Sequence, residues 1–234
     1  MTGPLFQYAE VFRTSTLEPN PNGSVIQEVT SGGTPSTAVE GYWGGTIPWL
    51  TPKEVCEDKD KMFFSKTERF ITQDGLKNSG AKLLPTETVM LTKRAPVGEV
   101  AINAVPMANN QGFLSFRCGK DLDPLYLYFW FKANKPYLEV VANGSTYPEL
   151  YVGDLFEFVI GYPSIEEQKR VVKLLLSLSL AISLGSALES TSAEARLIDA
   201  IHRDTSFLEN LKQRLMLNLI SGRLTVNDLV EHVE

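Results

Sequence analysis

The C-terminal quarter of the chain, residues 164–222, carries a hydrophobic periodicity that predicts two successive helices. Ser164 and Glu167 have the spacing of a capping box, in which the hydroxyl accepts from a backbone amide and the carboxylate reaches back. Apolar residues then recur at steps of three and four, which is the period of an amphipathic helix. Gly185 is typical of the end of this first helix.

The second expected helix carries a heptad-like seam and ends at Ser221-Gly222. A helix of about 30 residues spans roughly 45 Å, which favours a strut that pairs with another long helix. The alternative is an amphipathic pair that folds back on its own domain. For the strut, the predicted dimerisation residues are Leu197, Ile201, Leu208, Leu211 and Leu215.

Composition is ordinary for a globular protein with a hydrophobic core: 234 residues, 43% hydrophobic and 21% charged. Cys56 and Cys118 have no metal-like spacing, and the chain opens without a signal-peptide pattern. The most apolar run is shorter than a membrane span requires. We therefore expect a cytoplasmic protein with no membrane partner.

The net charge of −6 is distributed unevenly along the chain. Residues 51–150 hold 13 Lys and Arg against 12 Asp and Glu, whereas residues 151–234 hold 8 against 12. The middle of the chain is therefore able to present a local basic face to a polyanion. The alternative is a neutral solvated surface with no polyanion partner.

Short apolar runs and turn signals predict an α+β fold, with a mixed α/β head followed by long C-terminal helices. Strands are expected at residues 25–30, 88–92, 100–103, 113–117 and 155–160. Two short helices are expected at 124–132 and 136–142, the first opened by a proline and the second closed by Asn143-Gly144.

Polar side chains near two turns are the first candidates for nucleic-acid contact. Lys93 and Arg94 would be displayed at the tip of the hairpin between 88–92 and 100–103, where they suit phosphate or, for Arg94, guanine. The amides of Asn109, Asn110 and Gln111 match the edge of adenine. Such amides equally cap their own backbone in tight turns.

Further candidates for nucleic-acid contact lie in another polar turn. Ser145, Thr146 and Tyr147 form a polar turn suited to contacts with the DNA backbone. Trp43, which lies beside glycines, suits core packing more than base stacking.

The sequence contains no catalytic constellation, and His202 and His232 have no metal-ligand neighbours. We therefore expect no catalytic residue, no metal site and no cofactor in this chain.

Several ordered motifs together resemble the specificity subunit of type I restriction-modification systems. They lie at residues 30–36, 42–49, 91–98, 110–113, 144–146 and 163–170. The resemblance implies a target-recognition domain at 1–162 and a conserved helical spacer and dimerisation region at 163–234. Since the base readers of this family usually lie between its motifs, Lys53, Arg69 and Lys77 are further candidates.

The resemblance also implies a non-catalytic subunit that recognises one half of a bipartite duplex target. S-adenosylmethionine and the adenine chemistry would belong to partner methyltransferase subunits, with a restriction/translocase subunit as a further partner. Most members have two recognition domains, whereas this chain has one, so a homodimer would restore the second half and predict a two-fold symmetric target. The alternative is an oligomerisation or regulatory scaffold that does not itself recognise DNA.

Overall fold

The structure is a computed structural model that describes residues 12–59, 61–94, 96–142 and 148–189, with residues 213, 216–218 and 220–221. Residues 15–160 form one compact unit, and the described residues on either side of this range belong to a second unit. The two units are described separately. The division into residues 1–162 and 163–234 stays a prediction.

A five-stranded sheet with the order β2-β9-β6-β7-β4 is the centre of residues 15–160. Neighbouring strands are antiparallel, except that β4 pairs with β7 in parallel. Every residue of β6 and β7 is buried, which explains their continuous apolar runs. The strands are β2 (Ile26–Ser31), β4 (Phe63–Phe64), β6 (Val89–Thr92), β7 (Val100–Asn103) and β9 (Phe113–Cys118). Four of the five strands expected from the sequence are thereby confirmed.

One long helix, α3 (Pro124–Ala142), packs against β6 and β7. It corrects the prediction of two short helices, because the helix continues through Pro136. A proline inside a helix removes one backbone hydrogen bond and costs about 3 kcal/mol. Burial of the aromatic run from Tyr126 to Phe131, and of Leu138 and Ala142 one turn apart, offsets that cost.

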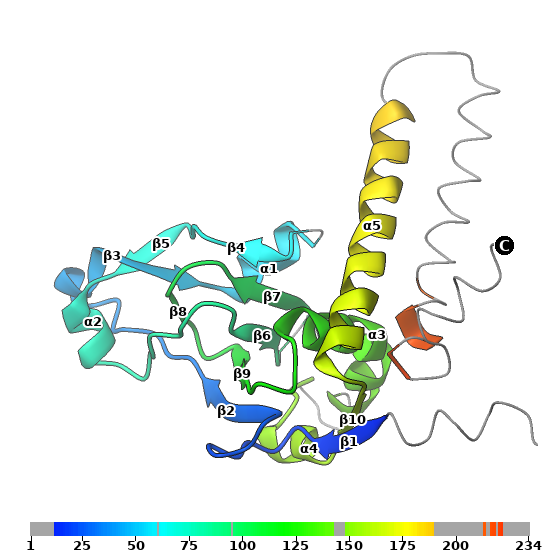
Figure 1. Ribbon diagram of the computed structural model, residues 1–234. Coiled ribbons are helices and arrows are strands. Elements are labelled where there is room, and N and C mark those ends of the chain that lie inside the picture. The colour runs from blue at the N-terminus through cyan, green and yellow to red at the C-terminus, as the bar shows by residue number, and fades with distance from the viewer. Residues whose placement is uncertain are drawn as a thin grey trace, which may run out of the picture. The chain divides into compact units, whose positions relative to one another are not determined.

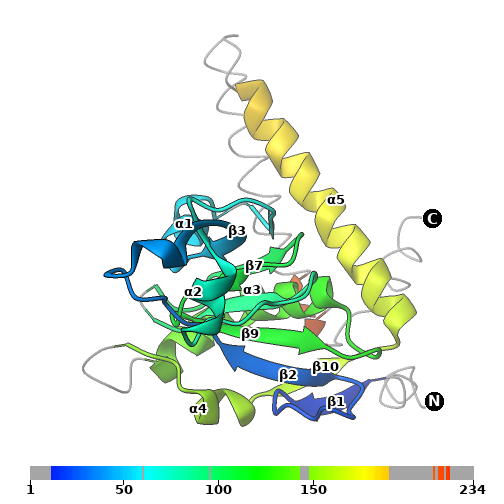
Figure 2. The ribbon, with the colours of Figure 1, turned by 90° about the vertical axis from the view of Figure 1, so that its left-hand side faces the viewer.

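A smaller sheet with the order β5-β3-β8 adjoins the first one. Its strands are β3 (Trp43–Leu50), β5 (Arg69–Ile71) and β8 (Ala108–Asn109). Three short helical segments accompany it, namely η2 (Glu40–Tyr42), α1 (Pro52–Glu57) and α2 (Gln73–Lys77). The β3–β5 pair extends away from the five-stranded sheet and carries α2 at its outer end (Figures 1 and 2). Residues 43–50 and 69–77 are called the arm below.

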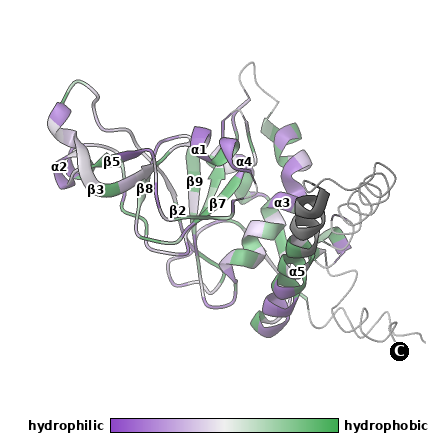
Figure 3. Cartoon of the chain, turned by 90° about the horizontal axis from the view of Figure 1, so that it is seen from above, coloured by the Kyte–Doolittle hydropathy of each residue, from purple (hydrophilic) through white to green (hydrophobic). Residues whose placement is uncertain are grey.

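The core follows the two sheets. One cluster includes Leu50, Met90 and Phe113 between the sheets, and a second, smaller one includes Trp49 and Ile71 inside the arm. In Figure 3, strand β7 is hydrophobic, whereas the short helices α1 and α2 are hydrophilic. The arm therefore has its own small core beneath a polar outer surface.

The last part of this unit corrects the expected strand at residues 155–160. Residues Val152–Phe156 form helix α4, and strand β10 (Val159–Tyr162) begins later and pairs with β1 (Arg13–Thr16). Leu155 and Phe158 are both buried, and the amide of Phe158 donates to the carbonyl of Leu155. Two buried residues three positions apart fit a helical turn rather than a strand, in which buried residues alternate. The short apolar run did not reveal this spacing.

Helix α5 (Ile165–Glu189) is the main element of the other unit. Its expected N-terminus is confirmed, because the amide of Glu167 donates to the Ser164 hydroxyl at 3.4 Å and that of Gln168 to the Ser164 carbonyl at 2.9 Å. The end expected at Gly185 is wrong, since the helix continues for four further residues. A helical glycine costs only about 1 kcal/mol relative to alanine. The seam residues of the second expected helix lie outside the described residues.

Candidate nucleic-acid interface

Two tryptophans of β3 connect the arm to the loop at residues 32–36. The indole N–H of Trp43 donates to the carbonyl of Ser36 at 3.1 Å, and that of Trp49 donates to the carbonyl of Gly33 at 2.9 Å. The two rings meet edge to face, with centroids 5.1 Å apart. These contacts join the loop at residues 32–36 to β3, so the motif residues shared by this loop and strand build scaffold.

The glycines of the same motifs have two different backbone roles. A Cβ at Gly32 or Gly33 would collide with backbone atoms, of Asn109 and Gly80 respectively, so both positions require close chain approach. Gly44 has a φ of +76° and nothing within 4 Å of the position of a Cβ. The strand therefore presents bare, exposed backbone beside Trp43.

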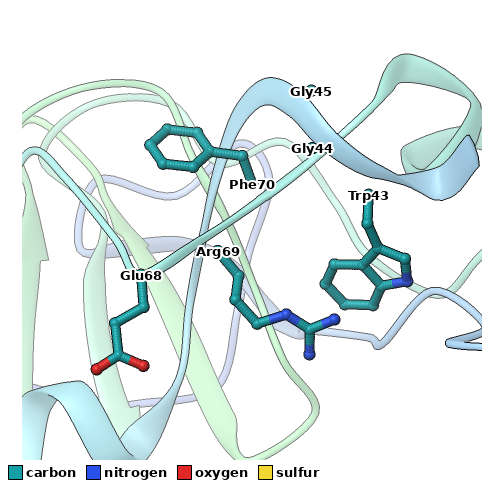
Figure 4. Close-up of a pocket in the computed structure, with 6 residues that line it drawn as sticks. All are labelled: Trp43, Gly44, Gly45, Glu68, Arg69 and Phe70. Carbon is teal, nitrogen blue, oxygen red and sulfur yellow. The ribbon is translucent and has the colours of Figure 1, made fainter. Parts of the chain in front are cut away.

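Arg69 of β5 lies next to this bare backbone. Its guanidinium carbon is 3.5 Å from the centroid of the Trp43 ring and 5.4 Å from that of Trp49. A shallow cavity of about 290 Å³ is lined here by Trp43, Gly44, Gly45, Glu68, Arg69 and Phe70. Figure 4 shows the Arg69 side chain extended toward the indole of Trp43, with the Glu68 carboxylate directed away from it. The arm thus holds one stacked guanidinium at an open surface.

Unpaired cations concentrate in one segment, residues 61–82. It contains five exposed Lys and Arg against two Asp and Glu. Within the described parts of the chain, none of the five lies within 4.0 Å of a carboxylate. These cations are Lys61, Lys66, Arg69, Lys77 and Lys82. The segment includes β5 and α2 of the arm, so this positive charge lies on the arm, at Arg69 and Lys77, and in the residues next to it in sequence.

Lys93 and Arg94 have a different environment from the expected one. The hairpin of β6 and β7 is confirmed, but the Lys93 ammonium lies 3.3 Å and the Arg94 guanidinium 3.0 Å from the same oxygen of Glu149. The Lys93 side chain is only 15% exposed. Burial raises the pKa of Glu149, but hydrogen bonds from Arg94 and Lys93 outweigh this and lower the pKa below its usual value. The expected display is therefore wrong for Lys93, which is largely buried, whereas Arg94 is 53% exposed but already paired with Glu149.

The three amides at residues 109–111 differ from one another in exposure. Asn109 is buried, and its amide nitrogen donates to the Ser115 hydroxyl at 2.7 Å. Asn110 accepts from the amide of Gly112 at 2.8 Å, which is the backbone-capping alternative. Gln111 is exposed, and its side-chain oxygen accepts from the Thr34 hydroxyl. Gln111 is thus the most exposed of the three, Asn110 is half-buried and Asn109 is buried.

The remaining candidates fall into three groups. Lys53 lies 3.5 Å from both Glu57 and Glu68, whose charges raise the pKa of its ammonium. Lys77 is exposed in the last turn of α2. Outside the described residues lie Ser145, Thr146 and Tyr147, and also Leu197, Ile201, Leu208, Leu211 and Leu215.

Lys61, Lys66 and Lys82 were not among the candidates from the sequence, because a run of charged residues is most often a solvated face. The excess of cations in residues 61–82 was the available signal. In the described parts of the chain, the structure contains no cluster of three or more His, Cys, Asp or Glu suited to a metal ion. Over the same residues, no helix has the length and apolar character needed to cross a membrane.

Comparisons with known proteins agree with this architecture. Residues 22–190 match the family model of the type I restriction modification DNA specificity domain. The MjaIX specificity subunit of Methanocaldococcus jannaschii, a type I restriction enzyme subunit, is 41% identical over 152 residues, or 64% of this chain and 35% of that protein. A type I restriction enzyme specificity subunit of Escherichia coli is 27% identical over 151 residues, or 62% of this chain and 36% of that protein.

Solved structures show the same fold at low sequence identity. The HsdS subunit from Thermoanaerobacter tengcongensis matches with a TM-score of 0.54 and 18% identity over 96% of this chain and 47% of that chain. A chain from a study of complex assembly and conformational transition of the type I R-M system matches with a TM-score of 0.58 and 19% identity, over 94% of this chain and 47% of that one. The present chain therefore spans less than half the length of the relatives it matches.

Proposed function

Because the chain belongs to the family of type I restriction modification DNA specificity domains, we propose that it recognises duplex DNA as the specificity module of a type I restriction-modification complex. The observation that carries this proposal is the exposed, unpaired positive charge of residues 61–82 on and beside the arm. Such cations bind DNA phosphates. Because this binding releases the counterions condensed on the DNA, the affinity falls as the salt concentration rises.

The chain would recognise one half of a bipartite target. Its matches cover only about a third of each curated relative, and it has one candidate recognition domain. Pairing of two copies through the C-terminal helices would place two equivalent heads on one duplex, and a two-fold symmetric target would follow. Leu208 and Leu215 of the predicted seam are the residues on which this pairing would depend.

Chemistry on the DNA would belong to partner subunits. The relatives are named as specificity subunits, a non-catalytic role. We therefore assign adenine methylation and S-adenosylmethionine binding to methyltransferase subunits that dock on this chain, and cleavage to a restriction/translocase subunit. The second candidate role is an oligomerisation or regulatory scaffold of such a complex, which would join the assembly without recognising DNA.

A binding selection separates the two roles. The full chain, alone and together with the methyltransferase subunit of its system, is incubated with a pool of duplexes randomised over about 20 positions. Retained duplexes are then sequenced at several salt concentrations. We expect enrichment of a split, symmetric motif and an affinity that falls steeply with salt. Binding of the methyltransferase subunit without enrichment of any sequence would favour the scaffold role and contradict the proposal.

A further inference from the structure

We propose that Arg69 is a specificity-determining residue that recognises a guanine in the major groove, and that Trp43 is the positioning residue that holds its guanidinium in place. This inference rests on the proposed function. It identifies the side chain that distinguishes one base pair of the DNA target. It depends on the stacking of the guanidinium, the absence of a carboxylate partner and the open surface around it.

The stacking arrangement restricts Arg69 before any ligand arrives. Its guanidinium lies 3.5 Å from the centre of the Trp43 ring, within the range of a cation–π contact. Trp43 is itself held by its N–H bond to Ser36 and by its edge-to-face contact with Trp49. Because the plane of the fork is already set, Arg69 loses less rotamer freedom on binding than a free surface arginine does.

The N–H groups of the stacked guanidinium are available. In the described parts of the chain, no carboxylate lies within 4.0 Å of Arg69, although Glu68 precedes it directly. Glu68 pairs instead with Lys53 at 3.5 Å, and its carboxylate is directed away from Arg69 (Figure 4). By contrast, Arg94 is already paired with Glu149. Arg69 is therefore the stronger candidate of the two for an external pair of acceptors.

The surroundings of Arg69 favour a base edge over a phosphate. Guanine presents O6 and N7 side by side in the major groove, which matches the planar fork of arginine. The wall of the cavity is formed by an indole, by Phe70 and by the bare backbone of Gly44, where no Cβ obstructs approach. Phosphate contact needs only a charge, which the exposed Lys77 of the arm and Lys66 beside the arm supply.

The test compares base preferences of the full-length wild type, Arg69→Ala, Arg69→Lys, and Lys77→Ala as the matched control, each with its methyltransferase subunit. Wild type and Arg69→Ala are passed through the randomised-duplex selection, and binding to single-substitution duplexes is then measured for all four. We expect Arg69→Ala to lose about 5- to 150-fold of discrimination at one guanine position, with other positions unchanged. Arg69→Lys keeps the charge but should not restore the preference. Lys77→Ala should weaken binding equally for all sequences and reduce the salt slope by about 1.

Variants of Trp43 separate positioning from packing. Trp43→Leu should reduce the guanine preference while Arg69 is still present, and Trp43→Tyr, which restores an aromatic face, should recover most of it. Thermal melting of each variant monitors the fold, and Arg69→Ala and Arg69→Lys, at an exposed position, serve as tests that do not depend on Trp43 packing.

Three outcomes would overturn the inference. The first is an intact guanine preference in Arg69→Ala, and the second is an equal loss of binding to all sequences in Arg69→Ala, which would make Arg69 a phosphate contact. Restoration of the preference by Arg69→Lys would show that charge alone suffices. In each of these cases wild-type selection persists and the proposed function stands. If the wild type selects no sequence, the proposed function itself fails, and the inference fails with it.

Discussion

Replacement of Glu99 by glutamine tests how much a buried carboxylate contributes to the stability of residues 15–160. The Glu99 side chain is only 3% exposed, and three ammonium groups surround its carboxylate, from Lys135 at 2.6 Å, Lys132 at 3.7 Å and Lys59 at 3.9 Å. Burial raises the pKa of Glu99. The hydrogen bond from Lys135 and the charges of the three lysines lower this pKa by a larger amount, so the net shift is downward.

Glu99→Gln keeps the volume of the side chain and removes its charge. A charge-assisted hydrogen bond is worth about 1.5–3 kcal/mol, and breaking a fully buried ion pair costs about 3–5 kcal/mol. Lys132 and Lys135 remain about a quarter exposed and can regain water, so the cost here is lower. We expect a loss of about 2 kcal/mol in the free energy of unfolding at pH 7, or about 4–8 °C in Tm.

The dependence on pH follows from the direction of the pKa shift. A carboxyl group whose pKa is lower in the folded state stabilises the fold above its unfolded pKa, about 4.3, and loses this contribution as the pH falls through the folded value. Urea titrations of wild type and Glu99→Gln from pH 7 to pH 3 should therefore converge below about pH 4. Glu57→Gln is the control, because its pair with Lys53 is exposed and should contribute under about 0.5 kcal/mol. A Glu99→Gln loss no larger than this control, or one independent of pH, would refute the reasoning.

Three further predictions concern the scaffold and the proposed dimer. Gly33→Ala should destabilise the protein by about 1–3 kcal/mol in urea titrations, because its Cβ would collide with backbone, whereas Gly41→Ala, which meets nothing within 4 Å, should not. Asn110→Ala should cost about 1 kcal/mol of stability while the selected DNA motif stays unchanged; an altered motif would make Asn110 a base reader. Replacing Leu208 and Leu215 by lysine should give monomers in sedimentation with an intact first melting transition, and a persistent dimer would place the contact elsewhere.

Local sequence patterns predicted the position of several strands and helices. They were less successful in predicting where a helix or strand begins or ends. The strands at β2, β6, β7 and β9 and the start of α5 follow from apolar runs and from Ser164, because these signals act over a few neighbouring residues. The break expected before Pro136 was wrong, since burial of the α3 aromatics against the sheet outweighs the local cost of a proline. The strand expected at 155–160 was placed too early, because a short apolar run has no clear period; the strand that precedes Pro163 is Val159–Tyr162.

The candidate site depended still more on contacts between distant parts of the chain. Adjacent cations at Lys93 and Arg94 were the obvious choice, yet both pair with Glu149, more than fifty residues later. Arg69 was one of several alternatives until its stacking on Trp43 became visible. The sequence could not distinguish the two cases, because the acidic residue that pairs with Lys93 and Arg94 and the indole that stacks on Arg69 both lie far from these cations along the chain.

By itself, the sequence determined the strands β2, β6, β7 and β9, the start of α5 and, through its ordered motifs, the family to which the chain belongs. Only the tertiary structure decided which cations are neutralised and which amides are enclosed. Secondary structure follows from interactions among near neighbours, whereas the charge and access of a side chain depend on the distance to groups that folding brings together from far along the chain.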